Sequence, residues 1–242
     1  MDIKILLRDL GNLLYGGQML TGGYAVFWFV TCLLITQVVM AGLTTLIKQI
    51  PLQIAVILVL YILAHVETSF FPNANIPWNA DVAFLAMTYY AAGYYVRPIL
   101  QKLFQYRIVF LCALMLPAIL ITGDLLHLFQ YKLDMKVLEY TNWFLDLFIP
   151  LAMTLSFLTI SYWIVRLKTV AKILSYIGLM SLTIMYMHFP INLVFEELTG
   201  EQTVIQYLLL GVIIPVFLHL VISRITLAKI LFLGSLYKAK AA

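Results

Sequence analysis

Residues 23–46, GYAVFWFVTCLLITQVVMAGLTTL, form a predominantly apolar run that contains no Asp, Glu, Lys or Arg. The run exceeds the ~20 residues that an α-helix needs to cross a hydrocarbon core of ~30 Å. The rest of the 242-residue chain is similar, since 64% of all residues are hydrophobic and 11% are charged, against ~45–50% and ~25% in soluble domains. The sequence therefore predicts an integral membrane protein.

Apolar segments of spanning length follow one another along the chain and predict an all-α, polytopic helix bundle that forms one membrane domain over residues 1–242. We expect seven spans, at about 23–46, 50–66, 80–96, 108–123, 143–165, 173–195 and 203–222. The second is the least secure, because Pro51 opens it and the turn-rich FFPNANIPWN at 70–79 closes it. That segment could also be tilted or re-entrant. Cys32 and Cys112 lie inside apolar spans at different depths, so we expect two inert, buried thiols and no disulfide.

Both ends of the chain contain charged residues among apolar ones. Residues 1–17, MDIKILLRDLGNLLYGG, are interrupted by charges and indicate an interfacial lead-in rather than a cleaved signal peptide. Residues 223–242, SRITLAKILFLGSLYKAKAA, set four Lys or Arg among apolar residues. This pattern predicts a basic amphipathic helix at the membrane surface.

The Lys and Arg residues between the spans predict the orientation. With seven spans, the segments on the N-terminal side of the membrane hold four of them and those on the other side hold eleven. Positive charge is retained in cytoplasmic loops. We therefore predict that the C-terminus is inside and the N-terminus outside.

In this orientation, the unusual ionisable residues gather toward the outer ends of the spans. They are His65, Glu67, Asp81, Asp124, His127, Asp146, His188 and Glu196. A polar cavity that opens outward is one interpretation, and solvation of each side chain at headgroup level is the other. Asp146 and His188 lie inside apolar runs, where a charge is costly without a partner or water. For these two we expect either a function or a buried polar network.

The run MYMHFPINLVF at 185–195 gives His188 a polar setting. At ~100° per residue, Ser181, Met185, His188 and Asn192 share one stripe of the sixth span. Pro190 lacks a backbone N–H and predicts a loosened helix there. The stripe predicts a helix face that lines a cavity or packs on other helices. His219, alone in an apolar run, is interpreted as a packed or interfacial side chain.

Several kinds of site have no motif in this sequence. It contains no Gly-rich phosphate loop, no metal-ligand spacing and no nucleophile elbow. Nucleic-acid binding and soluble metalloenzyme chemistry are therefore not expected. The basic inner loops could hold the phosphates of a nucleotide-like cofactor, although the positive-inside rule already explains them.

Three segments resemble a known pattern. Residues 22–39, GGYAVFWFVTCLLITQVV, are similar to the GxLWFLxxLFxxQ span of the type-3 acyltransferase family, which comprises integral-membrane O-acyltransferases of polysaccharides and other envelope glycans. Residues 76–98, IPWNADVAFLAMTYYAAGYYVRP, resemble its PWxxDxAxxAxxFxxxGYxxR span, and residues 172–195, KILSYIGLMSLTIMYMHFPINLVF, its LxxIGxxSLxIYLxHFPI span. The three occur in the family order.

The resemblance implies a function. Relatives have about ten helices, use acyl-CoA from the cytoplasm and acylate an acceptor on the outer side, so we expect an acetyl group to pass from acetyl-CoA to an envelope glycan hydroxyl in the bacterial plasma membrane, without a metal. The expected partners are membrane lipid, the glycan and acyl-CoA. The family's Arg-x-x-x-His-type catalytic element, in its first spans, has no match here, and the chain is expected to begin after the third family helix.

The resemblance therefore leaves the catalytic residue unknown. It carries over Asp81, Arg97 and His188 as site-lining residues, to which the sequence pattern adds Asp146, Ser181 and Asn192. The alternative hypothesis is a non-catalytic membrane protein, transporter-like or partner-binding, with an outward polar cavity.

Overall fold

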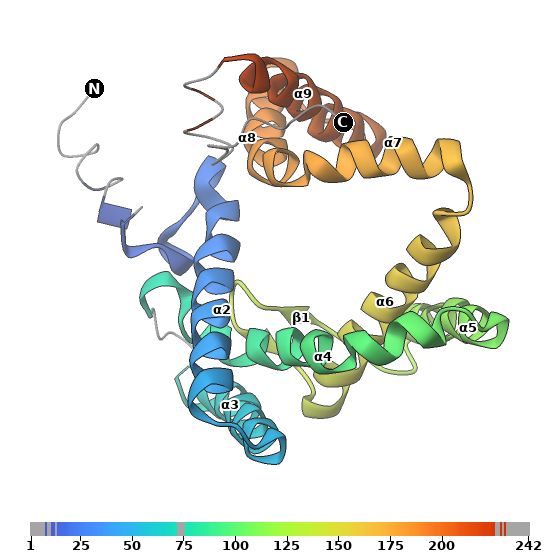
Figure 1. The fold of residues 1–242 in the computed structure, drawn as a ribbon. Coiled ribbons are helices and arrows are strands. Elements are labelled where there is room, and N and C mark those ends of the chain that lie inside the picture. The colour runs from blue at the N-terminus through green and yellow to red at the C-terminus, as the bar shows by residue number, and fades with distance from the viewer. Residues whose placement is uncertain are drawn as a thin grey trace. The chain divides into compact units, whose positions relative to one another are not determined.

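The computed structural model describes residue 8, residues 11–12, 14–71 and 76–225, and residues 228 and 230. Most of the predicted N-terminal lead-in and of the predicted amphipathic tail therefore lies outside the described residues. The described chain is helical apart from loops and one short antiparallel hairpin (Figure 1). The long helices are α2 (Trp28–Leu46), α3 (Ile50–Phe70), α4 (Val82–Leu103), α5 (Arg107–Leu125), α6 (Trp143–Ile164), α7 (Lys168–Leu179), α8 (Ser181–Thr199) and α9 (Val204–Arg224).

The helices confirm an all-α membrane bundle. Five segments are long and apolar enough to cross a bilayer: Gly22–Leu46, which includes the 3-10 turn Gly22–Phe27 before α2, and the helices α3, α5, α6 and α9. The uncertain second span is a continuous helix of 21 residues. A sixth span arises if α7 and α8 are counted together. The third expected span, 80–96, falls mostly in α4, which has 22 residues but is more polar than these segments.

The expected sixth span, 173–195, is wrong as one continuous helix. The chain bends by 67° between α7 and α8. The break falls at Met180, whose φ of −98° and ψ of 2° leave the helical region. By contrast, α8 continues through Pro190. The predicted loosening at the proline is therefore not the main bend of this segment.

The chain divides into two compact units. One contains the residues up to Thr21 together with Phe27–Lys168, and the other contains Gly22–Val26 together with the residues from Thr169 onward.

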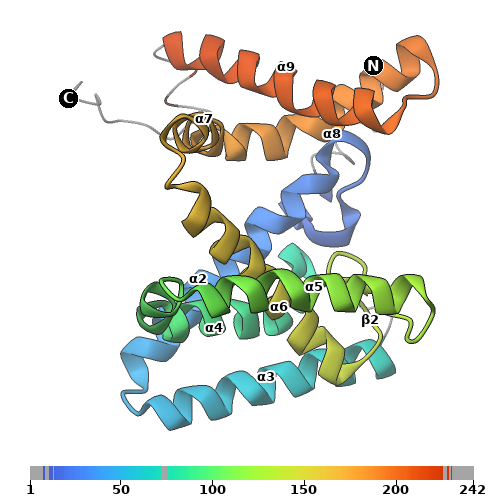
Figure 2. The same cartoon turned by 90° about the vertical axis from the view of Figure 1, so that its right-hand side faces the viewer.

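In the first unit, α4 packs against both α2 and α3, and α5 packs against α6 (Figure 2). The first half of α4 is covered by these neighbours, since Val82, Ala83, Leu85 and Met87 are at most 2% exposed. A helix that is covered by its neighbours needs less apolar surface than one that faces lipid. Tyr89, also in α4, then finds a polar partner inside the bundle, as described below.

The loop between α5 and α6 also belongs to the core of the first unit. It contains the two short strands β1 (Leu133–Asp134) and β2 (Glu139–Tyr140), which pair antiparallel. Leu138, at the turn, is 6% exposed and packs with Cys32 of α2 and Val82 of α4. Leu138 thus anchors the loop to α2 and α4.

In the second unit, α8 and α9 form a helical hairpin. Gly200 follows α8 with a φ of +85°, in the left-handed region that glycine adopts easily. Thr203 and Gln206 then start α9 with a reciprocal capping box. The two helices are the most extensively packed pair in the described chain. Elsewhere, Cys32 and Cys112 are both free; Cys32 is buried as expected, whereas Cys112 is exposed on the surface of α5, so its expected burial is wrong.

Candidate functional site

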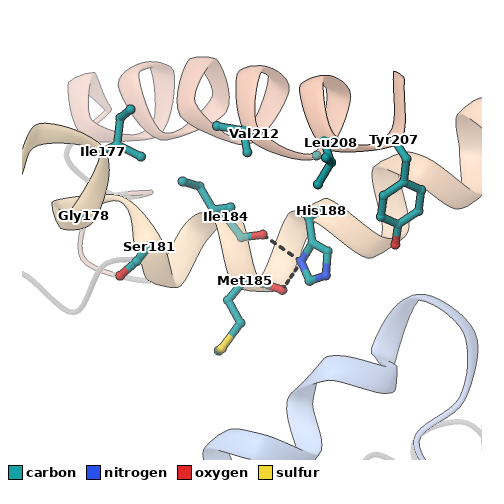
Figure 3. Close-up of a pocket in the computed structure, with 10 residues that line it drawn as sticks. Ile177, Gly178, Ser181, Ile184, Met185, His188, Tyr207, Leu208 and Val212 are labelled. Atoms are coloured by element: carbon teal, nitrogen blue, oxygen red, sulfur yellow. Dashed lines mark hydrogen bonds between the residues drawn. The ribbon is translucent and has the colours of Figure 1, made fainter. Parts of the chain in front are cut away.

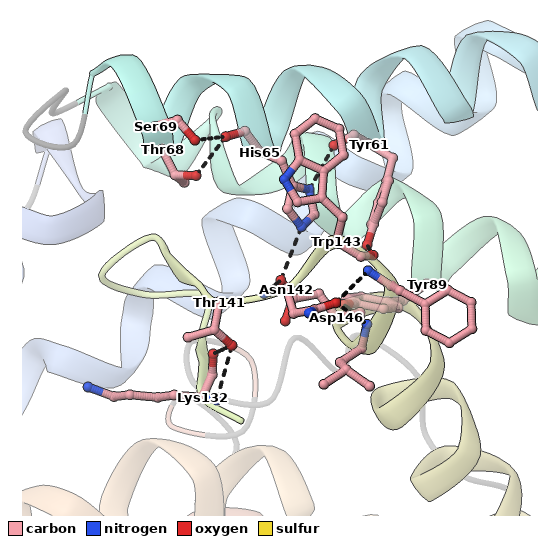
Figure 4. A network of polar contacts seen from close by, with 12 residues as sticks. Tyr61, His65, Thr68, Ser69, Tyr89, Lys132, Thr141, Asn142, Trp143 and Asp146 are labelled. Carbon is pink, nitrogen blue, oxygen red and sulfur yellow. Dashed lines mark hydrogen bonds and ion pairs between the residues drawn. The ribbon is translucent and has the colours of Figure 1, made fainter. Parts of the chain in front are cut away.

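A buried histidine and a buried aspartate meet in the first unit. Nε2 of His65, in α3, lies 3.1 Å from Oδ2 of Asp146, in α6 (Figure 4). Nδ1 of His65 lies 3.0 Å from the carbonyl oxygen of Tyr61, one turn earlier in α3. His65 is 2% exposed and Asp146 is 0% exposed. A carbonyl oxygen only accepts, so Nδ1 carries a proton and Nε2 shares one with the carboxyl group.

This geometry determines what His65 can do chemically. A general base needs a lone pair within hydrogen-bond reach of the proton that it takes. Both ring nitrogens of His65 are engaged inside the protein, and its ring is covered by aromatic side chains. Ring centroids lie 4.5 Å away at Tyr61, 4.9 Å at Trp143 and 5.4 Å at Tyr140. The pair is therefore arranged to hold α3 and α6 together, and not to exchange protons with a substrate.

The first turn of α6 positions Asp146. Asn142 caps the helix, since its Oδ1 accepts from the backbone N–H groups of Phe144 and Leu145 at 3.0 and 3.1 Å. The backbone N–H of Asn142 in turn donates to Oδ2 of Asp146 at 3.1 Å. A carboxylate one turn into a helix is also favoured by the positive end of the helix dipole. The stretch NWFLD thus orients the carboxyl group before His65 is added.

A proline explains a second polar contact around Asp146. Pro150, four residues later in α6, has no N–H to donate to the carbonyl of Asp146. The hydroxyl of Tyr89, in α4, donates to that carbonyl oxygen instead. The hydroxyl of Tyr61 similarly donates to the carbonyl of Trp143. Two tyrosines thus satisfy backbone groups of α6 and connect α3 and α4 to its first turns.

Near Asp146, the start of α4 and the loop before α6 each contribute a buried or partly buried polar side chain. Asp81 caps α4, accepts from the N–H of Val82 at 2.8 Å and is 2% exposed. Burial raises the pKa of the Asp81 carboxyl, although its backbone hydrogen bonds oppose the shift. Burial likewise raises the pKa of Tyr140, to which the charges of Asp81 and Asp146 contribute. The two predicted aspartates therefore belong to one buried polar region of the first unit.

A groove in the second unit contains another histidine. It runs between α8 and α9, continues to the end of α7 and has a volume of about 380 Å³ (Figure 3). Its walls are mostly apolar. The polar or histidine side chains on it are Ser181, His188 and Tyr207. Ser181, Met185 and His188 come from the predicted stripe, so that part of the stripe does line a groove.

His188 differs from His65 in how its ring is bonded. Its Nδ1 lies 2.8 Å from the carbonyl oxygen of Met185 and 3.1 Å from that of Ile184, both in its own helix. Nδ1 must therefore donate, and in the neutral ring Nε2 holds the lone pair. No other residue of the described chain bonds Nε2. The side chain is half-buried, so this nitrogen is available to a ligand in the groove.

The two helices that form the groove are joined on either side of His188. Nδ2 of Asn192 donates to the carbonyl of His188 at 2.8 Å and to that of Tyr207, in α9, at 3.2 Å. Nearer the start of α8, Thr183 bonds Nδ1 of His219 at 2.8 Å. His219 is thus a packed histidine, one of the two interpretations given above. These contacts fix the helix face that presents His188.

The close approach of the helices also depends on Gly211. A Cβ at this position in α9 would lie 3.0 Å from Nδ2 of Asn192 and 3.4 Å from Cβ of His188. Asn192 is 2% exposed. Its role here is to join helices, which the pattern of polar residues on one stripe allowed but did not single out.

The structure does not bring all six predicted residues together. Asp81 and Asp146 belong to the first unit, whereas Ser181, His188 and Asn192 belong to the second. Arg97 is exposed near the far end of α4, 16 residues or ~24 Å along the helix from Asp81. The partner that the sequence analysis missed is His65, which lies 81 residues from Asp146 in the chain. Only its place at the same predicted end of a span hinted at the pair.

Comparisons with known proteins add no relative. No protein-family model, no curated protein and no solved structure matches this chain. Within the residues that the structure describes, no three His, Cys, Asp or Glu side chains are grouped so as to hold a metal ion. The function therefore has to be argued from the groove, the buried network and the sequence motifs.

Proposed function

We propose that this membrane protein is an O-acyltransferase that moves an acyl group, expected to be acetyl, from acyl-CoA to a hydroxyl of an envelope glycan in the bacterial plasma membrane. The observation that carries the proposal is the groove beside α8, where His188 has one free ring nitrogen. The resemblance of residues 172–195 to the corresponding family span supports the same reaction. The free nitrogen is independent of the sequence motif, because a sequence does not specify which ring nitrogen of a histidine is hydrogen-bonded.

The chemistry places simple demands on the site. The acceptor oxygen attacks the thioester carbonyl carbon, the C–S bond breaks, and the hydroxyl proton must leave while the thiolate gains a proton. Nε2 of His188 can accept a hydrogen bond from the acceptor hydroxyl, since Nδ1 already donates to the backbone. The apolar walls of the groove exclude water, which would otherwise compete as an acceptor. Acyl-CoA enters the proposal as a substrate only.

The test uses membranes that contain the protein and radiolabelled acetyl-CoA. We expect transfer of label to envelope glycan, and a loss of about 10²–10⁴-fold in His188→Ala, the usual contribution of a positioned base or hydrogen-bonding group. His127→Asn is the matched control. His127 is exposed in a turn with a φ of +56°, which asparagine tolerates. Undiminished transfer in His188→Ala at equal protein abundance would exclude this role.

The walls of the groove favour one alternative as a second candidate. Most of the residues that line it are apolar, which suits the hydrocarbon chain of a lipid-linked glycan held without chemistry. A protein of this kind would bind such a lipid and transfer no label. Binding without transfer by the wild-type protein would support it, whereas transfer that depends on His188 would exclude it.

A further inference from the structure

Helix α7 reaches the groove only with its last residues, Ile177 and Gly178, and has no residue buried in the protein. At ~100° per residue, four of its side chains share one apolar face and three polar ones share the opposite face. The apolar face consists of Val170, Ile173, Leu174 and Ile177, and the polar face of Lys168, Lys172 and Ser175. Three of the apolar side chains are between 42% and 56% exposed, and Ile177 is half-buried. Apart from Ile177, which also lines the groove, this face has no covering from the described residues of the second unit.

The angle to α8 indicates how α7 lies in a membrane. α8 has 19 residues, so at ~1.5 Å per residue it is ~28 Å long, close to the ~30 Å thickness of a hydrocarbon core, although its apolar content reaches that of a span only when α7 is counted with it. The bend of 67° at Met180 turns α7 toward the membrane plane. A tilt of α8 of ~20°, which is usual for spanning helices, is enough to bring α7 parallel to the surface.

Charge identifies the lipid. Lys168 and Lys172 lie one turn apart on the polar face, and residues 165–180 contain no Asp or Glu. In a spanning position Lys172 would lie within the hydrocarbon, where lysine is rarely found without a partner. At the headgroup level the same two ammonium groups face anionic phosphates, while the opposite face enters the acyl region.

We infer that α7 is an in-plane amphipathic helix that binds the anionic phospholipid surface at the end of the membrane where α8 begins. The apolar face is embedded at the boundary between headgroups and acyl chains, and Lys168 and Lys172 contact the phosphate groups. The helix so placed fixes the depth of the start of α8, and with it the groove. The inference does not depend on the proposed acyltransferase activity.

The position of α7 is tested with single-cysteine variants of the full-length protein in which Cys32 and Cys112 are replaced by alanine. Spin labels at Lys168, Ile173, Ser175 and Ile177 are measured in nanodiscs for collision with oxygen, which partitions into lipid, and with a water-soluble nickel chelate. An in-plane helix gives an alternation: Ile173 and Ile177 in lipid, Lys168 and Ser175 in water. Depth that increases steadily from Lys168 to Ile177 would mean that α7 continues the α8 span, and water access at all four positions would mean that it is not embedded. Either result overturns the inference.

Lipid charge is tested by comparing nanodiscs of phosphatidylcholine alone with nanodiscs that also contain about 30% of the anionic lipid phosphatidylglycerol, which attracts basic segments. Enrichment of phosphatidylglycerol around the purified protein should fall by about five-fold per lysine in Lys168→Gln/Lys172→Gln. It should remain in Lys168→Arg/Lys172→Arg, which keeps the charge, and in Lys132→Gln/Lys136→Gln, which removes two charges from the hairpin loop. Equal enrichment in the Gln pair and in the wild type would overturn the assignment to anionic lipid.

Discussion

His65 and His188 lie in helices of the two different units, and their surroundings differ in every respect that controls reactivity. His65 is 2% exposed and uses both ring nitrogens within the protein. His188 is half-buried and uses one nitrogen, for two carbonyls of its own helix. A bonded and buried imidazole stabilises a fold, whereas one with a free nitrogen on a groove can meet a ligand. Membrane burial alone does not distinguish a structural from a functional histidine.

The largest effect is expected at the buried pair of His65 and Asp146, where the histidine has a structural role. Asp146→Ala leaves Nε2 of His65 without a partner in a site that is 2% exposed. Removing one member of a buried pair costs about 3–5 kcal/mol, because the remaining polar group is buried unpaired. We expect a large drop in the thermal unfolding temperature of the detergent-solubilised protein.

The control for this variant removes both polar groups. In His65→Leu/Asp146→Leu no unpaired charge remains, and replacement of a buried pair by apolar side chains is often close to neutral. The double variant should therefore be more stable than Asp146→Ala. A single Asp146→Ala variant that unfolds like the wild type would show that the pair does not hold α3 to α6.

A second, smaller effect concerns the carbonyl that Pro150 leaves free. Tyr89→Phe removes the hydroxyl that donates to the carbonyl oxygen of Asp146, and we expect a loss of about 1–2 kcal/mol. Pro150→Ala restores an N–H for the same carbonyl. In that background Tyr89→Phe should cost less, which a double-mutant cycle of unfolding free energies measures. Tyr90→Phe, on the neighbouring residue, serves as the control, and equal costs in both backgrounds would contradict the account.

Helix positions were largely predictable, because apolar runs near 20 residues and intervening Pro and polar residues are local signals. The ends of α5 and α6, for example, fall within two residues of the expected spans. The break at Met180 was missed, since neither Gly nor Pro stands at that position. A signal was present, however, in the amphipathic pattern of residues 168–179, which differs from that of a span.

Part of the candidate site was also predictable from the sequence, and part was not. The stripe that contains Ser181 and His188 follows from helical periodicity, and both residues line the groove. Which nitrogen of His188 is free depends on the side-chain rotamer, which the sequence does not specify. The pairing of His65 with Asp146 depends on tertiary packing between segments 81 residues apart. No local pattern in a single sequence records such a contact.

A third effect tests the second unit, where Gly211 lets α9 approach the helix that carries His188. In Gly211→Ala the new Cβ would lie 3.0 Å from Nδ2 of Asn192, which two hydrogen bonds hold in place. We expect a loss of about 0.5–1 kcal/mol in unfolding free energy, despite the better helix propensity of alanine. Gly178→Ala is the control. A Cβ there meets nothing within 4 Å, and a loss as large as that of Gly211→Ala would argue against a packing cause.

The smallest effect is a pH dependence in the buried region around Asp81. Burial raises the pKa of this carboxyl in the folded protein, so the folded state binds a proton more readily than the unfolded state. Its contribution to stability is then fully present below the unfolded pKa of about 3.9 and declines as pH rises through the folded pKa. Asp81→Asn can keep the acceptor for the N–H of Val82 and carries no charge. The unfolding temperature of the variant should therefore rise slightly relative to that of the wild type as pH increases from about 4, near the reference pKa of about 3.9, toward neutral. Unfolding temperatures measured across this range should diverge in that direction. Curves that run parallel would mean that the carboxyl is as well solvated in the folded protein as in the unfolded chain, in contrast to the burial of Asp81 in the polar region of the first unit.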